Sequence, residues 1–235
     1  MLLSSARFVL SLALACSTWV LTTAKPAAAA PICGISICTF DIGGGWDVEV
    51  DKPFIDAGLV DIITDDVNPP EFPDSVVIQK FAEFLANNTL ILTFKQTAVD
   101  AVSHIVLNDM GLTNSTGTDW AGFTEKLVDS GDAVFDTVAS AGFSIAPFTI
   151  ATFAEADTKW TASGGIVPDG TTWTPGASIF NGELVIDTIL GAGTVEDPYT
   201  VFSLKETPIP VPEPSSLLLA ALGIAGLALH GRRRA

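Results

Sequence analysis

The chain has 235 residues, of which 48% are hydrophobic and 16% charged, and its formal net charge is −16. The acidic residues are concentrated in the middle, because residues 31–211 hold six lysines, no arginine and 26 of the 27 carboxylates. Nucleic-acid affinity comes mainly from Lys and Arg side chains that displace counterions from phosphates, so this composition excludes nucleic-acid binding. The length is sufficient for one well-buried domain between two terminal segments of different composition.

Residues 1–30 have the order of a secretory signal peptide. Arg7 supplies a basic start, a long apolar run follows, and small residues occupy the end of the segment. This order is typical of a leader that is cut at an Ala-x-Ala-like site, and cleavage after Ala24 and cleavage after Ala29 both fit. The alternatives are a retained membrane anchor and a lipoprotein with a lipid on Cys16. The segment therefore predicts export.

Two cysteines, Cys33 and Cys38, remain after the predicted leader, with four residues between them. In an oxidising compartment such a pair favours a small disulfide loop. A redox-active pair at the surface is the alternative, whereas a zinc site would need further His or Cys ligands that the neighbouring sequence lacks. We predict a disulfide between Cys33 and Cys38, close to the new N-terminus.

The middle of the chain, residues 31–207, has the composition of short β-strands separated by polar turns. The clearest strand segments, which are apolar or alternate with period two, are 59–63, 89–94, 104–107, 143–153, 184–189 and 200–204. Residues 75–85 fit a short helix or a strand. Because no long amphipathic helix and no βαβ spacing occurs, the pattern predicts a mainly β fold: a single antiparallel β-sandwich-like domain.

Catalytic residues are not evident in this middle segment. His104 is its one histidine, and a Ser-His-Asp triad would need it as the base, but no Gly-x-Ser-x-Gly motif accompanies it. We expect His104 on the polar face of a strand, and a flexible turn at Gly43–Gly45, which lacks the lysine of a phosphate-binding loop. A glycosidase needs only two carboxylates, and chance pairs are frequent among so many acids, so a secreted hydrolase stays an alternative. The chain is predicted not to be an enzyme.

Two acidic segments are candidates for calcium: Asp61, Asp65 and Asp66, and then Asp129, Asp132 and Asp136 around Gly131. Carboxylate-rich loops supply the oxygen ligands that Ca²⁺ prefers. Neither segment has the spacing of an EF-hand loop, so solvated acidic turns are the interpretation that we favour. No other metal and no cofactor is predicted.

Tryptophans close to polar turns raise the question of sugar binding. Trp120 and Trp160 are candidate glycan contacts, because exposed aromatic rings stack on the C–H groups of sugars. Packing of these indoles in the core or in loops is the alternative. The first interpretation predicts a glycan-binding module, and the second gives the two residues a structural role only.

The C-terminal segment, residues 208–235, differs from everything before it. It begins Pro-Ile-Pro-Val-Pro-Glu-Pro, for which we expect an extended, exposed spacer, because proline cannot continue a helix or a sheet ladder. The apolar run 215–229 would be about 22 Å long as a helix, short of the roughly 30 Å hydrocarbon core. Arg232, Arg233 and Arg234 follow, and the positive-inside rule places them in the cytoplasm as a membrane stop. The segment predicts a short transmembrane helix that holds the protein only briefly.

Val211-Pro212-Glu213-Pro214, the short apolar run and the terminal arginines resemble, in this order, the PEP-CTERM sorting signal of Gram-negative bacteria. The resemblance covers about the last 25 residues. It implies an exosortase-type membrane enzyme as a processing partner and a link to extracellular polysaccharide and surface assembly. A plain C-terminal membrane anchor is the alternative.

The two terminal signals together predict a non-catalytic exported surface or matrix protein, tethered to the inner membrane as an intermediate. A glycan-binding module of the exopolysaccharide matrix is the second hypothesis.

Overall fold

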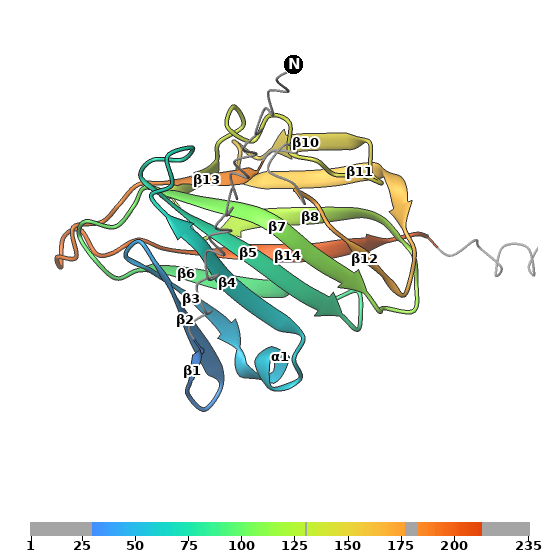
Figure 1. Cartoon of the computed structure of the whole chain (residues 1–235), viewed down its shortest axis with the longest axis horizontal. Helices are drawn as coiled ribbons and strands as arrows, with labels where there is room; N and C mark the ends of the chain where they lie inside the picture. The colour runs from blue at the N-terminus through green and yellow to red at the C-terminus, as the bar shows by residue number, and fades with distance from the viewer. Residues whose placement is uncertain (1–29, 130, 177–182, 213–235) are drawn as a thin grey trace, which may run out of the picture.

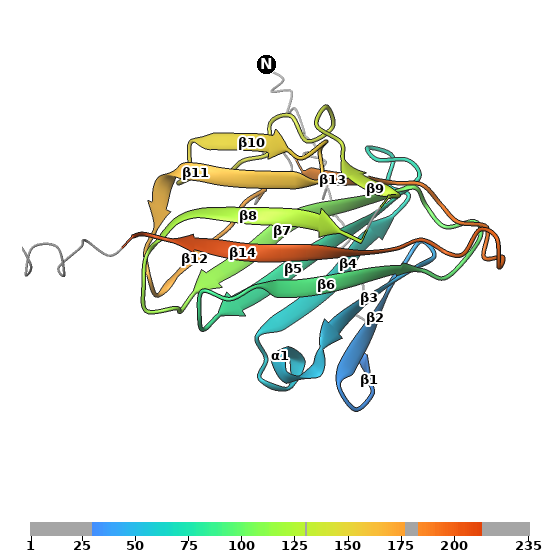
Figure 2. The same ribbon diagram turned by 180° about the vertical axis from the view of Figure 1, so that it is seen from behind.

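The computed structural model describes residues 30–129, 131–176 and 183–212, which form two β-sheets packed face to face (Figure 1). Within these residues the larger sheet has eight strands, in the spatial order β1 (Ile32–Cys33), β2 (Ile37–Gly43), β3 (Trp46–Asp51), β6 (Leu90–Gln96), β14 (Val201–Pro210), β8 (Trp120–Val128), β11 (Lys159–Val167) and β10 (Ile150–Ala154). Every neighbouring pair in it is antiparallel. The last strand in the described part of the chain, β14, therefore lies in the interior of this sheet (Figure 2).

The smaller sheet has six strands in the described part of the chain. Its order is β4 (Val60–Val67), β5 (Ser75–Phe84), β7 (His104–Asn114), β13 (Leu184–Thr188) and β9 (Ala133–Phe135), and β12 (Thr171–Trp173) pairs with β7 as well. The pair β5 and β7 is parallel. A short helix, α1 (Lys52–Asp56), connects β3 to β4 at the edge of the molecule (Figure 1).

The mainly β architecture with two sheets confirms the predicted class, but the purely antiparallel arrangement is wrong at β5 and β7. After β5 the chain crosses to the larger sheet, returns through it as β6, and re-enters the smaller sheet as β7. Two reversals give β7 the direction of β5. Parallel neighbours always need such a crossover, and here a strand of the opposite sheet supplies it.

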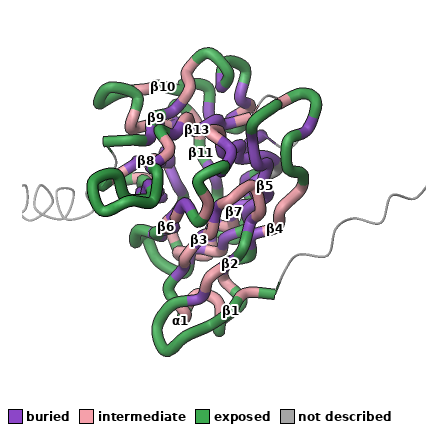
Figure 3. Tube along the Cα trace, turned by 90° about the vertical axis from the view of Figure 1, so that its left-hand side faces the viewer, coloured by how far each residue is buried: buried purple, intermediate pink, exposed green. Residues whose placement is uncertain are grey.

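Strand alternation builds the core between the sheets. On β14 the buried positions are Phe202, Leu204, Glu206 and Pro208, every second residue. Phe202 stacks on Phe94 of β6 with ring centroids 5.0 Å apart, so side chains of neighbouring strands meet on the inner face. Figure 3 shows the result: buried segments form the centre and exposed turns the periphery. A contiguous apolar core of this kind supplies most of the free energy of folding.

Three consecutive glycines form the hairpin turn between β2 and β3, as the sequence predicts. Gly43, Gly44 and Gly45 all have positive φ (77°, 59° and 80°), a conformation that glycine adopts without steric cost. A Cβ on Gly45 would lie 2.7 Å from the Cβ of Ala101. The turn also accepts a hydrogen bond from Val102 N to Gly44 O (2.8 Å), so it is packed against the body.

Five of the predicted strand segments, at 59–63, 89–94, 104–107, 184–189 and 200–204, overlap strands of the structure. Residues 75–85, for which helix and strand both fitted, form the strand β5, whose two faces are both largely buried. The strands β2, β3, β8 and β11 were not among the predicted segments, although β2 and β3 alternate with period two, with acidic residues at the outward positions of β3.

The predicted strand at 143–153 is wrong in its first half. Residues 143–149 are irregular apart from a turn at residues 146–147, and only Ile150–Ala154 is a strand. Phe143, Ile145 and Phe148 are nevertheless buried in the core. The hydrophobic residues of this segment therefore predicted its burial correctly. They did not predict its strand pairing, because Pro147 cannot donate to a ladder and the segment covers the end of the sandwich.

The predicted leader (1–30) and the apolar segment 215–229 lie outside the described residues, apart from Ala30. Among the residues that are described, none of the helices has the length and apolar character needed to cross a membrane.

Candidate functional site

The sorting motif begins where the sheet ends. Strand β14 runs to Pro210, and Val211 N donates a hydrogen bond to Asp119 O (2.8 Å), just before β8 begins. Val211 is half-buried and Pro212 is exposed. Glu213, Pro214 and the arginines at 232–234 lie outside the described residues. The first half of the motif is thus attached to the domain through one backbone hydrogen bond at the end of a strand.

The exposed spacer predicted from residue 208 onward starts later than expected, because Pro208 and Pro210 belong to β14. They pair with Phe123 and Trp120 of β8. Successive residues of a strand direct their N–H groups to opposite sides, so prolines at every second position all lack the donor on one side only.

On that side β14 has no partner at these residues. Strand β6 begins at Leu90, opposite Glu206, and does not extend alongside Pro208 or Pro210. On the other side Val211 keeps its N–H and uses it toward Asp119. The alternating prolines therefore let the chain leave the sheet on a strand that only β8 can pair.

The predicted disulfide is confirmed. Cys33 and Cys38 are opposite each other in the hairpin of β1 and β2, and their sulfur atoms are bonded (S–S 2.06 Å). Cys38 is fully buried, so the bond fixes the exposed first strand to the body.

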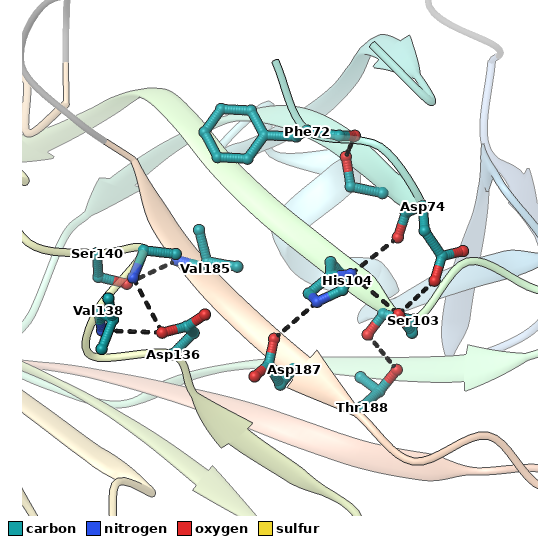
Figure 4. Close-up of polar contacts among 12 residues, drawn as sticks. Phe72, Asp74, Ser103, His104, Asp136, Val138, Ser140, Val185, Asp187 and Thr188 are labelled. Carbon is teal, nitrogen blue, oxygen red and sulfur yellow. Dashed lines mark hydrogen bonds and ion pairs between the residues drawn. The ribbon is translucent and has the colours of Figure 1, made fainter. Parts of the chain in front are cut away.

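His104 was predicted on the polar face of a strand, and the structure gives it several polar partners there (Figure 4). It is the first residue of β7, and its Nε2 lies 3.1 Å from Asp187 Oδ1 of the neighbouring β13. Its Nδ1 lies 3.0 Å from the carbonyl oxygen of Asp74 and 2.9 Å from Ser103 Oγ. Ser103 Oγ in turn lies 2.5 Å from Asp74 Oδ2. A serine, a histidine and two aspartates therefore meet at the ends of β5, β7 and β13.

The directions of these hydrogen bonds determine what this cluster can do. In the tautomer that carries its proton on Nδ1, His104 donates from Nδ1 to Asp74 O, because a carbonyl oxygen only accepts. Ser103 donates its hydroxyl proton to the carboxylate of Asp74. A nucleophilic serine instead needs a histidine nitrogen that accepts the hydroxyl proton. Ser103 Oγ is thus held by the Asp74 carboxylate directly before the start of β5.

Asp187 is the perturbed group of this cluster. Burial raises the pKa of its carboxyl, His104 lowers it, and the negative charge of Asp136 raises it again, with a net upward shift. Asp136 also caps the following turn, since its Oδ1 accepts from the N–H groups of Val138 (2.8 Å) and Ala139 (2.9 Å). A hollow lined by Phe72, His104, Asp136 and Val185 lies beside these groups.

The tryptophans proposed as glycan contacts are in the core. The exposed fraction is 0% for Trp120 and 1% for Trp160. Trp160 stacks on Trp173 with ring centroids 6.5 Å apart, and Trp120 contacts Phe84 edge-on at 5.5 Å. A ring that is enclosed by other rings cannot stack on a sugar. The hypothesis of sugar contact through these two residues is therefore wrong, and the alternative of core packing describes them.

The acidic segments do not form a compact ligand cluster. In the ranges 30–129, 131–176 and 183–212, no group of three or more His, Cys, Asp or Glu side chains is placed to hold a metal ion. Asp66 accepts a hydrogen bond from Val67 N (2.7 Å), and Asp136 caps its turn. Calcium binding by Asp61, Asp65 and Asp66, or by Asp129, Asp132 and Asp136, stays an untested prediction.

Sequence reasoning missed Asp74, Asp119 and Asp187. Asp74 has a positive φ of 59° in the turn before β5, and the Pro73-Asp74 pair indicates such a turn. Asp187 is on the outward face of β13, as alternation indicates. Its approach to His104, 83 residues earlier in the chain, depends on the pairing of β13 with β7, and no local pattern contains that information.

The fold and the C-terminal junction define a β-sandwich domain that ends in a processing signal. A family model described as the PEP-CTERM protein-sorting motif matches residues 210–234. The chain is thus a PEP-CTERM domain-containing protein, and the motif implies a secreted, surface-directed protein that an exosortase-type enzyme processes. No curated protein and no solved structure matches the chain significantly.

Proposed function

We propose that the protein is a non-catalytic component of the cell surface or the extracellular matrix, delivered by an N-terminal signal peptide and released by an exosortase-type enzyme. During export it is held in the inner membrane by its C-terminal apolar segment. The observation that carries this proposal is the match of the sorting motif to residues 210–234, which starts at the last residue of β14.

The geometry of the junction supports processing at this place. Pro212 is exposed, and the alternating prolines prevent β14 from gaining a second partner strand where the motif begins. A membrane enzyme that binds an extended peptide needs such an unpaired segment. The domain ends at the motif, so processing leaves both sheets complete.

The non-catalytic role is supported by the His104 cluster. A serine, a histidine and aspartates meet there, and the Ser103 hydroxyl donates its proton to the Asp74 carboxylate, whereas activation as a nucleophile would require donation to His104. The domain would then contribute surface, charge and stability to an assembly. Glycan binding through Trp120 and Trp160 is not proposed, because both indoles are buried.

The test is the intact mass of the protein recovered from the cells and the medium. Sorting predicts loss of the leader and of residues beyond the Pro212-Glu213-Pro214 region. Glu213→Gln should accumulate as an unprocessed membrane form, because it removes the charged residue of the motif. Glu196→Gln is the matched control, since Glu196 is exposed in a loop before β14, and it should be processed like the unaltered chain.

A mature protein that keeps its sequence through Ala235 and stays in the membrane fraction would show that the proposal is wrong. The apolar segment would then act as a permanent anchor. Equal processing of the Glu213 and Glu196 variants would show that the motif is not what the enzyme recognises.

A further inference from the structure

Three charged side chains are enclosed in the apolar core. Lys80 of β5, Glu125 of β8 and Glu206 of β14 each have an exposed side-chain fraction of 0%. Lys80 Nζ lies 3.3 Å from Glu125 Oε1 and is in direct contact with Glu206 Oε1. The cluster joins the two sheets, because β5 belongs to the smaller sheet and β8 and β14 to the larger one.

The strand register places these groups together. Glu125 and Glu206 are directly opposite each other in the antiparallel pair of β8 and β14, and both occupy inward positions of their strands. Lys80 shares the inward face of β5 with Ile78 and Ala82, which belong to the core cluster. The amine therefore projects from the facing sheet toward two adjacent carboxyl groups.

The charges of this cluster do not balance if all three groups are ionised. One ammonium and two carboxylates leave a net negative charge in an enclosed apolar core, where ions are strongly disfavoured. Burial is the main cause of both pKa shifts in the cluster: it lowers the pKa of the Lys80 amine and raises that of the Glu125 carboxyl. Both groups are thereby shifted toward their neutral forms.

One hydrogen bond, from Lys80 Nζ to Glu125 Oε1 (3.3 Å), offsets only part of this burial. Glu125 Oε2 and both carboxyl oxygens of Glu206 are buried without a hydrogen-bond partner among the described residues. The contact between Lys80 Nζ and Glu206 Oε1 is thus close without having hydrogen-bond geometry. Buried carboxylates are ordinarily satisfied by hydrogen bonds, so the ion pairs alone leave three carboxyl oxygens of this group without the partners that burial demands.

We propose that Lys80 and Glu206 form an intramolecular amide bond, that Glu125 carries the protons of the reaction, and that the bond covalently links the two sheets.

The reaction balances without a co-reactant. Transfer of one proton from the Lys80 ammonium to the Glu206 carboxylate gives a neutral amine and a carboxylic acid. Nζ attacks Cδ of Glu206 and forms the N–C bond, while Glu125 accepts a proton from Nζ and donates one to the departing hydroxyl. The C–O bond breaks and one water molecule leaves, and Glu125 ends in the protonation state in which it began. Nothing is oxidised or reduced.

The fold favours this condensation in two ways. Desolvation activates a lysine amine as a nucleophile, and reacting groups that a protein holds in contact reach effective concentrations on the order of 10⁵–10⁸ M. The product also removes two of the three buried charges. A neutral Glu125 then has the new amide beside it as a hydrogen-bond partner, so the core keeps no unpaired ion.

The test is mass spectrometry of the full chain after reduction and denaturation. We expect the intact mass to be lower than the sequence mass by one water molecule. We also expect trypsin not to cut after Lys80, although it cuts after Lys95 and Lys126. Fragmentation should locate a branched peptide that contains both Lys80 and Glu206.

The chain offers matched controls. Lys95 and Glu49 form an ion pair at 2.7 Å on the surface, with side chains 41% and 21% exposed, and we expect no branched peptide between them. Glu125→Gln keeps the shape of the core and removes the proton carrier, so the Lys80–Glu206 branch should be lost. Glu49→Gln removes a carboxylate of the surface pair and should leave the branch unchanged.

Cleavage after Lys80 in the unaltered chain, at the full sequence mass, would overturn the proposal, and this result does not depend on any variant folding. A water loss located at Asp169-Gly170, where aspartyl–glycine sequences can form a cyclic imide, would count against it as well. A branch that persists in Glu125→Gln would overturn the role of Glu125.

Discussion

Replacing Trp160 with alanine tests whether this residue belongs to the core or to a binding surface. Trp160 is 1% exposed, stacks on Trp173 and contacts Phe143 edge-on at 5.4 Å. Removal of a buried indole costs the transfer free energy of the lost atoms and leaves a cavity, together about 3–5 kcal/mol. Since a domain is stable by about 5–15 kcal/mol, the variant should lose a large part of its stability.

The assay is urea unfolding followed by intrinsic fluorescence or circular dichroism. With a slope of about 2 kcal/mol per molar urea, Trp160→Ala should shift the midpoint down by about 1.5–2.5 M. Trp160→Phe retains a ring against Trp173 and should shift it less. Val195→Ala is the control: Val195 is fully exposed, and the change should stay within about 0.5 kcal/mol.

An unchanged midpoint in Trp160→Ala, accompanied by loss of binding to matrix polysaccharide, would refute this reasoning. The indole would then have to be at the surface in solution, and the register of β11 with β8 would be wrong.

Three further predictions concern other parts of the domain. The pKa of Asp187 is raised in the folded state, so ionisation of its carboxyl opposes folding. The contribution of this group to the free energy of unfolding is therefore largest below the pKa of the unfolded state, and it is lost as the pH rises through the pKa of the folded state. Asp187→Asn should therefore flatten the dependence of the unfolding free energy on pH above a pH of about 4. At neutral pH the variant should be as stable as the parent or more stable, by less than about 1 kcal/mol. A variant that is clearly less stable at neutral pH would contradict the raised pKa of Asp187. Replacing Cys33 and Cys38 with serine opens a small loop and should lower the unfolding free energy by about 2 kcal/mol or less, measured by urea unfolding against the oxidised parent; no change would mean that the loop keeps its structure without the bond. Calcium should leave the melting temperature unchanged, because Asp136 already caps a turn, and a rise that chelation reverses would restore the acidic segments as a site.

Much of the strand content could be predicted from local sequence, since alternation marks inward positions wherever the residues are apolar. The disulfide was predictable for a similar reason, because Cys33 and Cys38 are close enough in the chain to meet whatever the rest of the fold does. The sorting motif needs no fold at all to be seen.

The errors have physical causes. Trp120 and Trp160 follow polar turns in the sequence, but each occupies a buried position of its strand. Whether such a residue is buried depends on which face of the sheet it lies on, and not on the polarity of the residues next to it in the sequence. Proline was taken to end the sheet at residue 208. Strand β14 continues because the missing donors of Pro208 and Pro210 all face the side that β6 does not reach.

The buried cluster of Lys80, Glu125 and Glu206 could be predicted only in part from the sequence. Glu125 and Glu206 each stand at an inward position between apolar or ring-bearing residues, so alternation marks both as buried acids. That Lys80 faces them could not be predicted, because it requires the crossover that places β5 opposite β8 and β14. Partners that are 45 residues or more apart in the chain come from topology.

The interior position of β14 also sets an order of events during export. The strand is the last to be synthesised, yet it lies between β6 and β8, and Phe202 is opposite Phe94 from more than 100 residues earlier. Under the proposed function, the larger sheet cannot be completed until residues 201–210 have crossed the membrane, directly ahead of the sorting motif at residues 210–234. Closure of this sheet and presentation of the motif to the proposed processing enzyme would then fall close together in time.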